Sequence, residues 1–343
     1  MKKLLIATLV ASTALAGCAT TGSSNTPVQT VKHSQQPDWV TQPPLKKGLA
    51  YGVGSMEIYG DQAAAVKRAA ELARVDLVSQ LKVTVSGDFS NDTTEFSGSG
   101  RQTEVVRTVR NYVRSQVPEA ELDDVVTADT YIDQTYAYVL AELDRVQAAA
   151  RLRRDIAATE QQIEDIAALS PEGTRLQQLQ PLLPALTLFA QRERLSERLQ
   201  LVSMDRQAAP LSVELRQVQD DIYRRIDQLQ VRLTVNNDGG REIEGGVLEA
   251  LTEQGLRIGG SADADLQFDL GATLSAKAQS GNHYVFIDSR LTIRDQSGRI
   301  LSSFSKQAKG VSGLQDVARQ KAARQVAALM ADELAATLVD KLR

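Results

Sequence analysis

The sequence contains very few residues of the kinds that build redox or metal sites. Its 343 residues include one cysteine, Cys18, and two histidines, His33 and His283. A disulfide within the chain is therefore excluded, as are a cysteine-based catalytic site and a histidine-rich metal site. The 39 basic and 43 acidic residues leave a net charge of −4, which argues against a nucleic-acid-binding surface. We expect no cofactor.

Aromatic residues are also scarce, at 4% of the chain, so the cores must consist mostly of Leu, Val, Ile and Ala. The length suggests two or three domains. Long apolar runs are missing as well. The most apolar stretch, Leu4–Ala11, is much shorter than the roughly 20 residues that a membrane-spanning helix needs.

Residues 1–17 have the features of a secretory signal peptide, because two lysines precede this apolar run and small residues follow it. The segment ends in Leu15-Ala16-Gly17-Cys18, which resembles the lipobox of bacterial lipoproteins. The resemblance implies a diacylglyceryl group on the Cys18 sulfur and a fatty acyl group on its new amine. An ordinary cleaved signal or a buried N-terminal helix is the alternative.

Two lipid chains on one protein are already enough for stable membrane anchoring. Lipoproteins kept in the inner membrane commonly carry Asp after the cysteine, so Ala19 implies an outer-membrane location facing the periplasm. Residues 18–36 are polar and poor in large apolar side chains, and we expect them to be a lipidated flexible tether. The expected partners are the membrane, through the lipid on Cys18, and envelope proteins. The sequence predicts no oligomeric state.

Residues 37–145 are predicted to form an α+β domain with an antiparallel sheet and packed helices. Four segments predict strands: Leu49–Met56, Lys82–Phe89, Val125–Ile132 and Thr135–Leu143. Asp61 is placed to cap a helix that follows it. The segment Thr103–Gln116 predicts a helix, although its valines also suit a strand.

Three groups of residues in this domain resemble the LPP20 family of bacterial lipoproteins. They are Pro37-Asp38-Trp39-Val40, Tyr51-Gly52-Val53-Gly54, and Ala73-Arg74-Val75-Asp76-Leu77 with Val83-Thr84-Val85 behind it. The resemblance implies an envelope lipoprotein, with flagellum-associated relatives and no established enzymatic activity. It supplies no catalytic residues.

Residues 146–228 predict a helical hairpin insertion, broken at Ser170–Gly173 and restarted at Pro181 and Pro184. We expect it to pack within the chain. The alternative is an interaction arm that presents the apolar stripe around Leu195 and Leu199.

Residues 229–343 predict a small C-terminal α/β domain, similar to that of related envelope lipoproteins. A strand at Leu229–Val235 is followed by a turn at Asn237–Gly240 and a helix from Glu242 that stops at Gly255. Four further strands follow, at Leu256–Ile258, Asp265–Ala276, Tyr284–Arg294 and Ile300–Lys306. A long helix over Ser312–Leu342 completes the domain.

No set of residues predicts catalysis. Gly52-Val53-Gly54 lacks the third glycine of a dinucleotide-binding loop and favours a plain strand. Asp263, Asp265 and Asp269 lack the remaining ligands of a calcium loop and are interpreted as solvated carboxylates. His283 is expected at the surface near a turn.

The remaining candidates for a catalytic or binding site are also interpreted as residues without a chemical role. Asp123-Asp124 and Asp220-Asp221 are adjacent pairs whose side chains point in different directions. Ser302, Ser303 and Ser305 have no histidine nearby in the sequence. The segments Arg151–Arg154 and Arg192–Arg198 are interpreted as solvated helix faces.

The sequence therefore predicts a non-enzymatic, outer-membrane-anchored lipoprotein that binds proteins of the cell envelope or supports its structure. A role at the flagellum is one option. Activation of a peptidoglycan synthase is an alternative within protein binding, and an envelope hydrolase is the alternative from another class.

Overall fold

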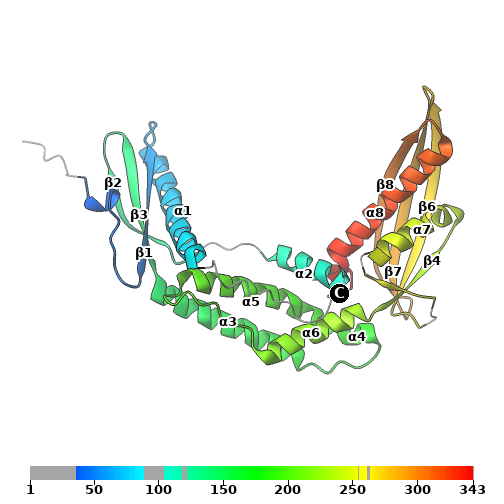
Figure 1. Cartoon of the computed structure of the whole chain (residues 1–343), viewed down its shortest axis with the longest axis horizontal. Helices are drawn as coiled ribbons and strands as arrows, with labels where there is room; N and C mark the ends of the chain where they lie inside the picture. Colours follow the sequence, from blue (N-terminus) through cyan, green and yellow to red (C-terminus); the bar gives the residue numbers. More distant parts are fainter. Residues whose placement is uncertain (1–35, 89–103, 118–121, 254, 261–262, 343) are drawn as a thin grey trace, which may run out of the picture. The chain divides into compact units, whose positions relative to one another are not determined.

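The computed structural model describes residues 36–88, 104–117, 122–253, 255–260 and 263–342. Cys18, the predicted signal peptide and the predicted tether up to residue 35 lie outside the described residues. Asp38–Arg343 form one compact unit, separate from Met1–Pro37. The combination of an antiparallel sheet, a mixed sheet and many helices confirms the predicted α+β class (Figure 1).

The described elements follow one another in this order: η1 (Asp38–Val40), β1 (Leu49–Glu57), α1 (Gln62–Asp88), α2 (Glu104–Gln116), β2 (Val126–Ile132), β3 (Tyr136–Asp144), α3 (Arg145–Ala167), α4 (Arg175–Leu179), η2 (Gln180–Leu182), α5 (Leu183–Val202), α6 (Val213–Asp227), β4 (Gln230–Val235), α7 (Asp238–Glu253), β5 (Arg257–Ile258), β6 (Leu266–Gln279), β7 (Asn282–Asp295), β8 (Ile300–Ser312) and α8 (Gln315–Leu342).

Sheet A is antiparallel, as predicted, and its strand order is β1–β3–β2. Helix α1 packs on one face of it, where β1 carries two glycines. A Cβ atom on Gly52 would lie 2.4 Å from the Ala73 carbonyl oxygen, and one on Gly54 would lie 2.1 Å from that of Ala69. Glycine is therefore required at both positions for the helix to pack this close to the strand.

Helix α1 continues through Lys82–Asp88, so the strand predicted at Lys82–Phe89 is wrong. The helix begins after the predicted cap, Asp61, whose carboxylate accepts a 3.0 Å hydrogen bond from the Ala64 N–H. Its buried residues recur at every fourth position: Ala65, Ala69, Ala73, Leu77 and Leu81. Extending an existing helix adds one hydrogen bond for each residue fixed, which overrides the alternating pattern of the valines.

Residues 104–116 form a helix, α2, rather than a strand. Its valines, Val105, Val106, Val109 and Val113, are buried together on one side of the helix. Spacings of three and four residues place them there, whereas a strand would divide them between two faces.

The predicted helical hairpin is present, with α3 and α5 packed side by side (Figure 1). Strand β3 passes into α3 without a linker. Asp144, the last strand residue, caps the helix by accepting hydrogen bonds of 3.0 and 2.9 Å from the N–H groups of Val146 and Gln147. Leu195 and Leu199 are only 9% and 2% exposed, so this stripe packs within the chain, and the alternative of an exposed interaction arm there is wrong.

The C-terminal sheet has the order β5–β4–β6–β7–β8, with parallel pairing on both sides of β4 and antiparallel pairing elsewhere. Helix α7 starts at Asp238, so the predicted turn at Asn237–Gly240 is wrong beyond its first residue. The Asn237 side chain accepts hydrogen bonds from the N–H groups of Gly240 and Ala272, at 2.8 and 3.1 Å. Gly239 and Gly240 let the first turn of α7 pack against β6, because a Cβ atom on Gly239 would lie 2.0 Å from the Ala272 carbonyl oxygen. Gly255, at φ +84°, follows the helix as predicted.

The described residues contain two large hydrophobic clusters. The smaller one joins sheet A and α1 to α3 and the end of α5. The larger one joins α2 and the helices α4–α6 to the C-terminal sheet, α7 and α8. The helical region therefore contributes to both cores, and the predicted domain boundaries at 145/146 and 228/229 stay predictions. No described helix is long and apolar enough to cross a bilayer.

Candidate functional site

Four of the aromatic residues of the chain lie together at sheet A. Tyr131 on β2 lies opposite Tyr138 on β3, with ring centroids 5.9 Å apart and the planes 28° from parallel. Tyr136 lies two residues from Tyr138 along β3, and their ring centroids are 6.0 Å apart. Trp39, the only tryptophan, donates a 2.8 Å hydrogen bond from its indole nitrogen to Asp129 on β2. We call these four aromatic residues the tyrosine face.

The tyrosine face points away from α1. Val139, the neighbour of Tyr138 along β3, packs in the cluster that contains Ala69 and Ala73 of α1. Because side chains alternate between the two faces of a strand, Tyr138 and its partner Tyr131 lie on the opposite face. Tyr136 is 38% exposed. Helix α1 thus leaves the tyrosine face uncovered.

Acidic groups at the edge of this face influence its tyrosines. The Asp133 carboxylate accepts 2.7 Å hydrogen bonds from the N–H groups of Tyr136 and Thr135, which lower the pKa of Asp133. Burial raises the pKa of Tyr138, and the charge of Asp133 raises it further. The Tyr138 hydroxyl therefore keeps its proton at neutral pH, and it shares a side-chain hydrogen bond with Asp133.

Strand β2 lies at the edge of the sheet and pairs on one side only, with β3. Its first five residues are exposed, and Val126 among them is 56% exposed. Exposed edge strands can add a strand from another chain through main-chain hydrogen bonds. Tyrosine and tryptophan combine an apolar ring with a polar tip and are enriched in protein interfaces. This arrangement can bind a partner.

The predicted lipidation site, Cys18, lies outside the described residues. Gly52 and Gly54 lie in β1 against α1, as expected of a plain strand. His283 is on β7, half-buried, next to the β6–β7 turn. Among the described residues, no group of three His, Cys, Asp or Glu side chains is placed to hold a metal ion.

The interpretation of the Asp263–Asp269 segment as solvated carboxylates is wrong for two of its three aspartates. Asp265 is 1% exposed and accepts hydrogen bonds from the Arg175 side chain at 3.1 Å and from the Gln230 N–H at 2.9 Å. Asp269 pairs with Arg294 at 2.7 Å. Both carboxylates are thus structural, because they join the sheet to neighbouring segments or strands.

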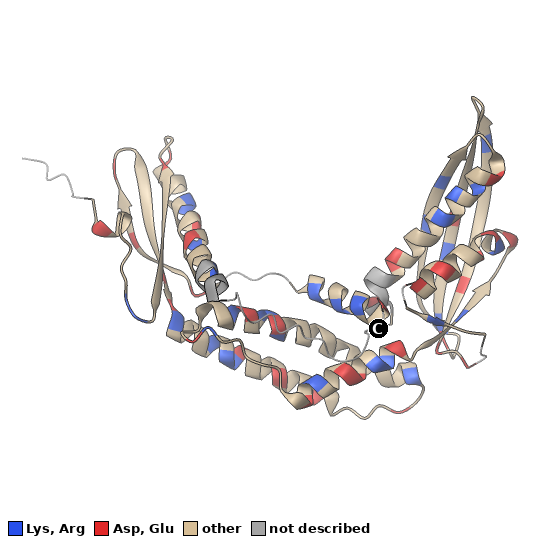
Figure 2. Cartoon of the chain, viewed as in Figure 1, with Lys and Arg blue, Asp and Glu red and all other residues tan. Residues whose placement is uncertain are grey.

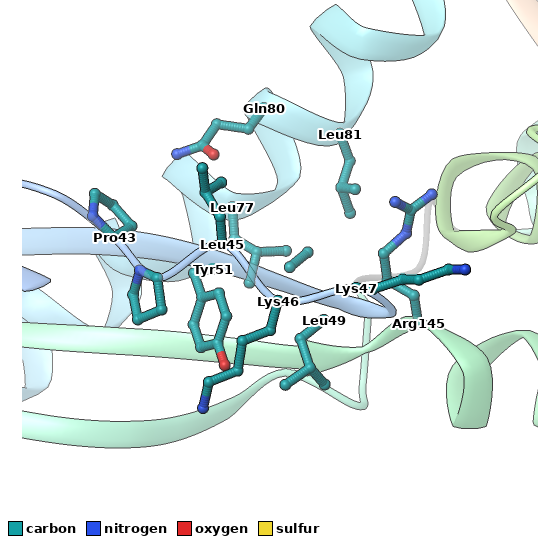
Figure 3. A pocket seen from close by; sticks show the side chains of 12 residues that line it. Pro43, Leu45, Lys46, Lys47, Leu49, Tyr51, Leu77, Gln80, Leu81 and Arg145 are labelled. Carbon is teal, nitrogen blue, oxygen red and sulfur yellow. The ribbon is translucent and has the colours of Figure 1, made fainter.

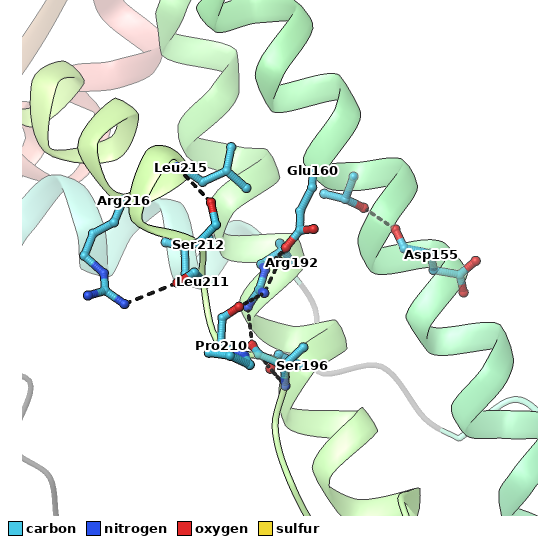
Figure 4. A network of polar contacts seen from close by, with 11 residues as sticks. Asp155, Glu160, Arg192, Ser196, Pro210, Leu211, Ser212, Leu215 and Arg216 are labelled. Atoms are coloured by element: carbon cyan, nitrogen blue, oxygen red, sulfur yellow. Dashed lines mark hydrogen bonds and ion pairs between the residues drawn. The ribbon is translucent and has the colours of Figure 1, made fainter.

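The interpretation of Arg192–Arg198 as a solvated face is wrong at Arg192, which is 5% exposed (Figure 4). Its guanidinium binds Glu160 on α3 at 2.9 Å and donates to the carbonyl oxygens of Ala209 and Pro210 at 2.7 and 2.8 Å. The Ser196 hydroxyl accepts from the Ala209 N–H and donates to its carbonyl oxygen, both at 3.0 Å. These contacts hold the connection between α5 and α6 against the hairpin.

The other candidates also take part in structural contacts. Asp123 and Asp124 both lie near Arg151, and Asp221 pairs with Arg224 and Arg225 within α6. Ser303 shares a 3.1 Å hydrogen bond with Thr292, and Ser305 accepts from Arg290 at 3.4 Å. None of these residues lies in an arrangement that resembles a hydrolase centre.

Sequence reasoning did not identify the tyrosine face. The available signal was the alternation of Tyr136 and Tyr138 along one strand in a chain with few aromatics, preceded by Tyr131 on the adjacent strand. The register that places Tyr131 beside Tyr138 becomes visible only in the structure.

No family model matches this chain, so the resemblance to the LPP20 family stays a prediction. No curated protein matches it either. Among solved structures, a secreted protein of Helicobacter pylori matches 83% of this chain over 98% of its own, at 17% identity and a TM-score of 0.41.

Two lipoproteins also match parts of the chain. A minor lipoprotein of Acinetobacter baumannii matches 32% of this chain over 92% of its own, at 14% identity and a TM-score of 0.26. A lipoprotein of Neisseria meningitidis matches 33% over 97%, at 10% identity and a TM-score of 0.22. The chain is thus similar to secreted proteins and lipoproteins of bacteria. All three TM-scores lie below the level at which two chains share a fold, so the function must be inferred from this chain's own residues.

Proposed function

We propose that this chain is a lipid-anchored protein of the bacterial outer membrane that binds other envelope proteins and catalyses no reaction. The tyrosine face is the observation that carries the proposal. Three tyrosines lie beside an edge strand on a sheet face that α1 does not cover, and the only tryptophan is bonded to that edge strand from η1, in a chain with 4% aromatic residues. Interfaces concentrate their binding energy in a few such aromatic anchors.

The anchoring part of the proposal is supported by the sequence before Ala19 and is tested separately. Cys18→Ser removes the acyl acceptor, so the variant should lose labelling by radioactive palmitate and leave the outer-membrane fraction. Continued labelling and co-fractionation with outer membranes would show that Cys18 is not the lipidation site.

The binding part is tested by capture of the partner in living cells. A photo-crosslinking amino acid at position 136 should attach the chain to a specific envelope protein, whereas the same amino acid at position 284, on the C-terminal sheet, should not. The identity of the captured protein distinguishes a flagellar component from a peptidoglycan synthase.

Substitution then measures the contribution of the face. Tyr136→Ala should weaken capture by at least about thirtyfold, because aromatic anchors contribute about 2 kcal/mol or more. Tyr284→Ala, which removes a tyrosine from the other sheet, is the matched control. Equal effects of the two variants, with both folded by circular dichroism, would refute the tyrosine face as the recognition surface.

A further inference from the structure

The turn before β1 combines an exposed apolar residue with unpaired positive charge. Leu45 is fully exposed and lies between Pro44 and Lys46. Lys46 and Lys47 are both exposed, and neither forms an ion pair within the described part of the chain. We call Pro43–Lys47 the Leu45 loop. Figure 2 shows a blue segment in this turn, whereas the strands of sheet A are mostly tan.

The Leu45 loop borders a groove of about 420 Å³ beside β1 (Figure 3). Apolar side chains from three elements line it: Leu45 from the loop, Leu49 from β1, and Leu77 and Leu81 from α1. Arg145 adds a cation to the lining, and it is fixed there by donating to the carbonyl oxygens of Val202 and Ser203, at 3.0 and 2.7 Å.

Both hydrogen-bond partners of the Arg145 guanidinium are neutral carbonyl oxygens, so these contacts leave its positive charge uncompensated. The groove and its loop therefore present three cations around an apolar centre. Positive charges that flank exposed apolar side chains are typical of protein surfaces that bind at the boundary between lipid headgroups and acyl chains. The negative surface potential of anionic lipids attracts such clusters.

The distance from Cys18 favours this partner over a soluble anionic one. The sequence places 17 residues between Cys18 and Gln36, and a chain of this length spans at most about 60 Å even when fully extended. A lipid on Cys18 would therefore keep the Leu45 loop close to the membrane surface at a millimolar effective concentration, so that even a weak contact is occupied.

We propose that the Leu45 loop docks on anionic lipid headgroups of the membrane that carries the chain's own anchor. Lys46, Lys47 and Arg145 attract the phosphate groups, and Leu45 inserts among the upper acyl carbons. The proximity of this contact rests on the proposed lipidation of Cys18, whereas its chemistry depends only on the Leu45 loop and Arg145.

The test uses the chain from Ala19 to Arg343, which keeps all described residues and lacks both the signal segment and the acyl acceptor. We expect it to co-sediment with vesicles of phosphatidylcholine and phosphatidylglycerol, and only weakly with phosphatidylcholine alone. Each lysine should contribute about fivefold to this binding. The double variant Lys46→Glu/Lys47→Glu should therefore bind at least about 25-fold more weakly.

The control variant is Lys67→Glu/Arg68→Glu, which makes the same change in net charge on an exposed part of α1. Leu45→Ser should weaken vesicle binding without any change in charge. Equal losses for the two charge-reversed variants, or no binding of the parent chain to anionic vesicles, would overturn the proposal. Palmitate labelling of Cys18 in cells is a separate measurement, so a failure of lipidation is distinguishable from a failure of the loop.

Discussion

Removal of the Arg192 side chain should be among the most destabilising single changes in the helical region. The guanidinium is buried and joins three segments through Glu160 and the carbonyl oxygens of Ala209 and Pro210. Breaking a buried ion pair by removing one partner costs about 3–5 kcal/mol. The Glu160 side chain is 27% exposed and regains some hydration, so we expect Arg192→Ala to lower the free energy of unfolding by about 3 kcal/mol.

Two further variants separate the contributions of charge and geometry. Arg192→Lys keeps the charge but cannot reach Glu160 and both carbonyl oxygens at once, so it should cost about 2 kcal/mol, within the range for lost charged hydrogen bonds. Arg154→Ala, an exposed arginine on α3, should change stability by less than about 0.5 kcal/mol.

Urea unfolding followed by circular dichroism measures these differences, and hydrogen exchange locates them. The amides of residues 203–212 should exchange faster in Arg192→Ala, because this connection loses the side chain that holds it. A cost below about 1 kcal/mol, or unchanged exchange in this connection, would refute the assigned role of Arg192.

Three other predictions follow from local geometry. Gly54→Ala should cost at least about 2 kcal/mol in thermal or urea unfolding because its Cβ would meet the Ala69 carbonyl, whereas Gly260→Ala, with open space around it, should not. Asp265→Ala should cost about 2–3 kcal/mol because it leaves the Gln230 N–H without its acceptor; a value near zero would contradict this. The pKa of Asp133 is lowered by folding, so its carboxylate stabilises the β2–β3 turn above the usual pKa of about 4, and that contribution is lost as the pH falls below it. NMR titration should show this turn loosening in acid, and Asp133→Ala should abolish the pH dependence.

Local signals in the sequence predicted much of the fold. Asp61 and Gly255 mark helix ends as expected, and the prolines at 181 and 184 lie in the first turns of restarted helices. These features depend on residues a few positions apart. The strand predicted after Lys82 was wrong because α1 continues through this segment, and its helical hydrogen bonding overrides the alternating pattern of the side chains.

The candidate site needed information that no single segment contains. Strand order and register bring Tyr131 beside Tyr138, and a hydrogen bond over 90 residues joins Trp39 to Asp129. The burial of Arg192 likewise depends on carbonyl groups from the α5–α6 connection, whose position the arginine-rich helix alone does not reveal.

Because β3 passes directly into α3, the end of the strand determines the direction in which the buried side chains of the helix point. Asp144 is the last residue of the strand and the cap of the helix, while the next residue, Arg145, is bound to the carbonyl groups of Val202 and Ser203. One residue inserted between them would turn α3 by about 100° about its axis and move its buried side chains away from α5. An insertion or deletion at this junction would therefore rotate the whole of α3 relative to α5, rather than only lengthen or shorten a loop.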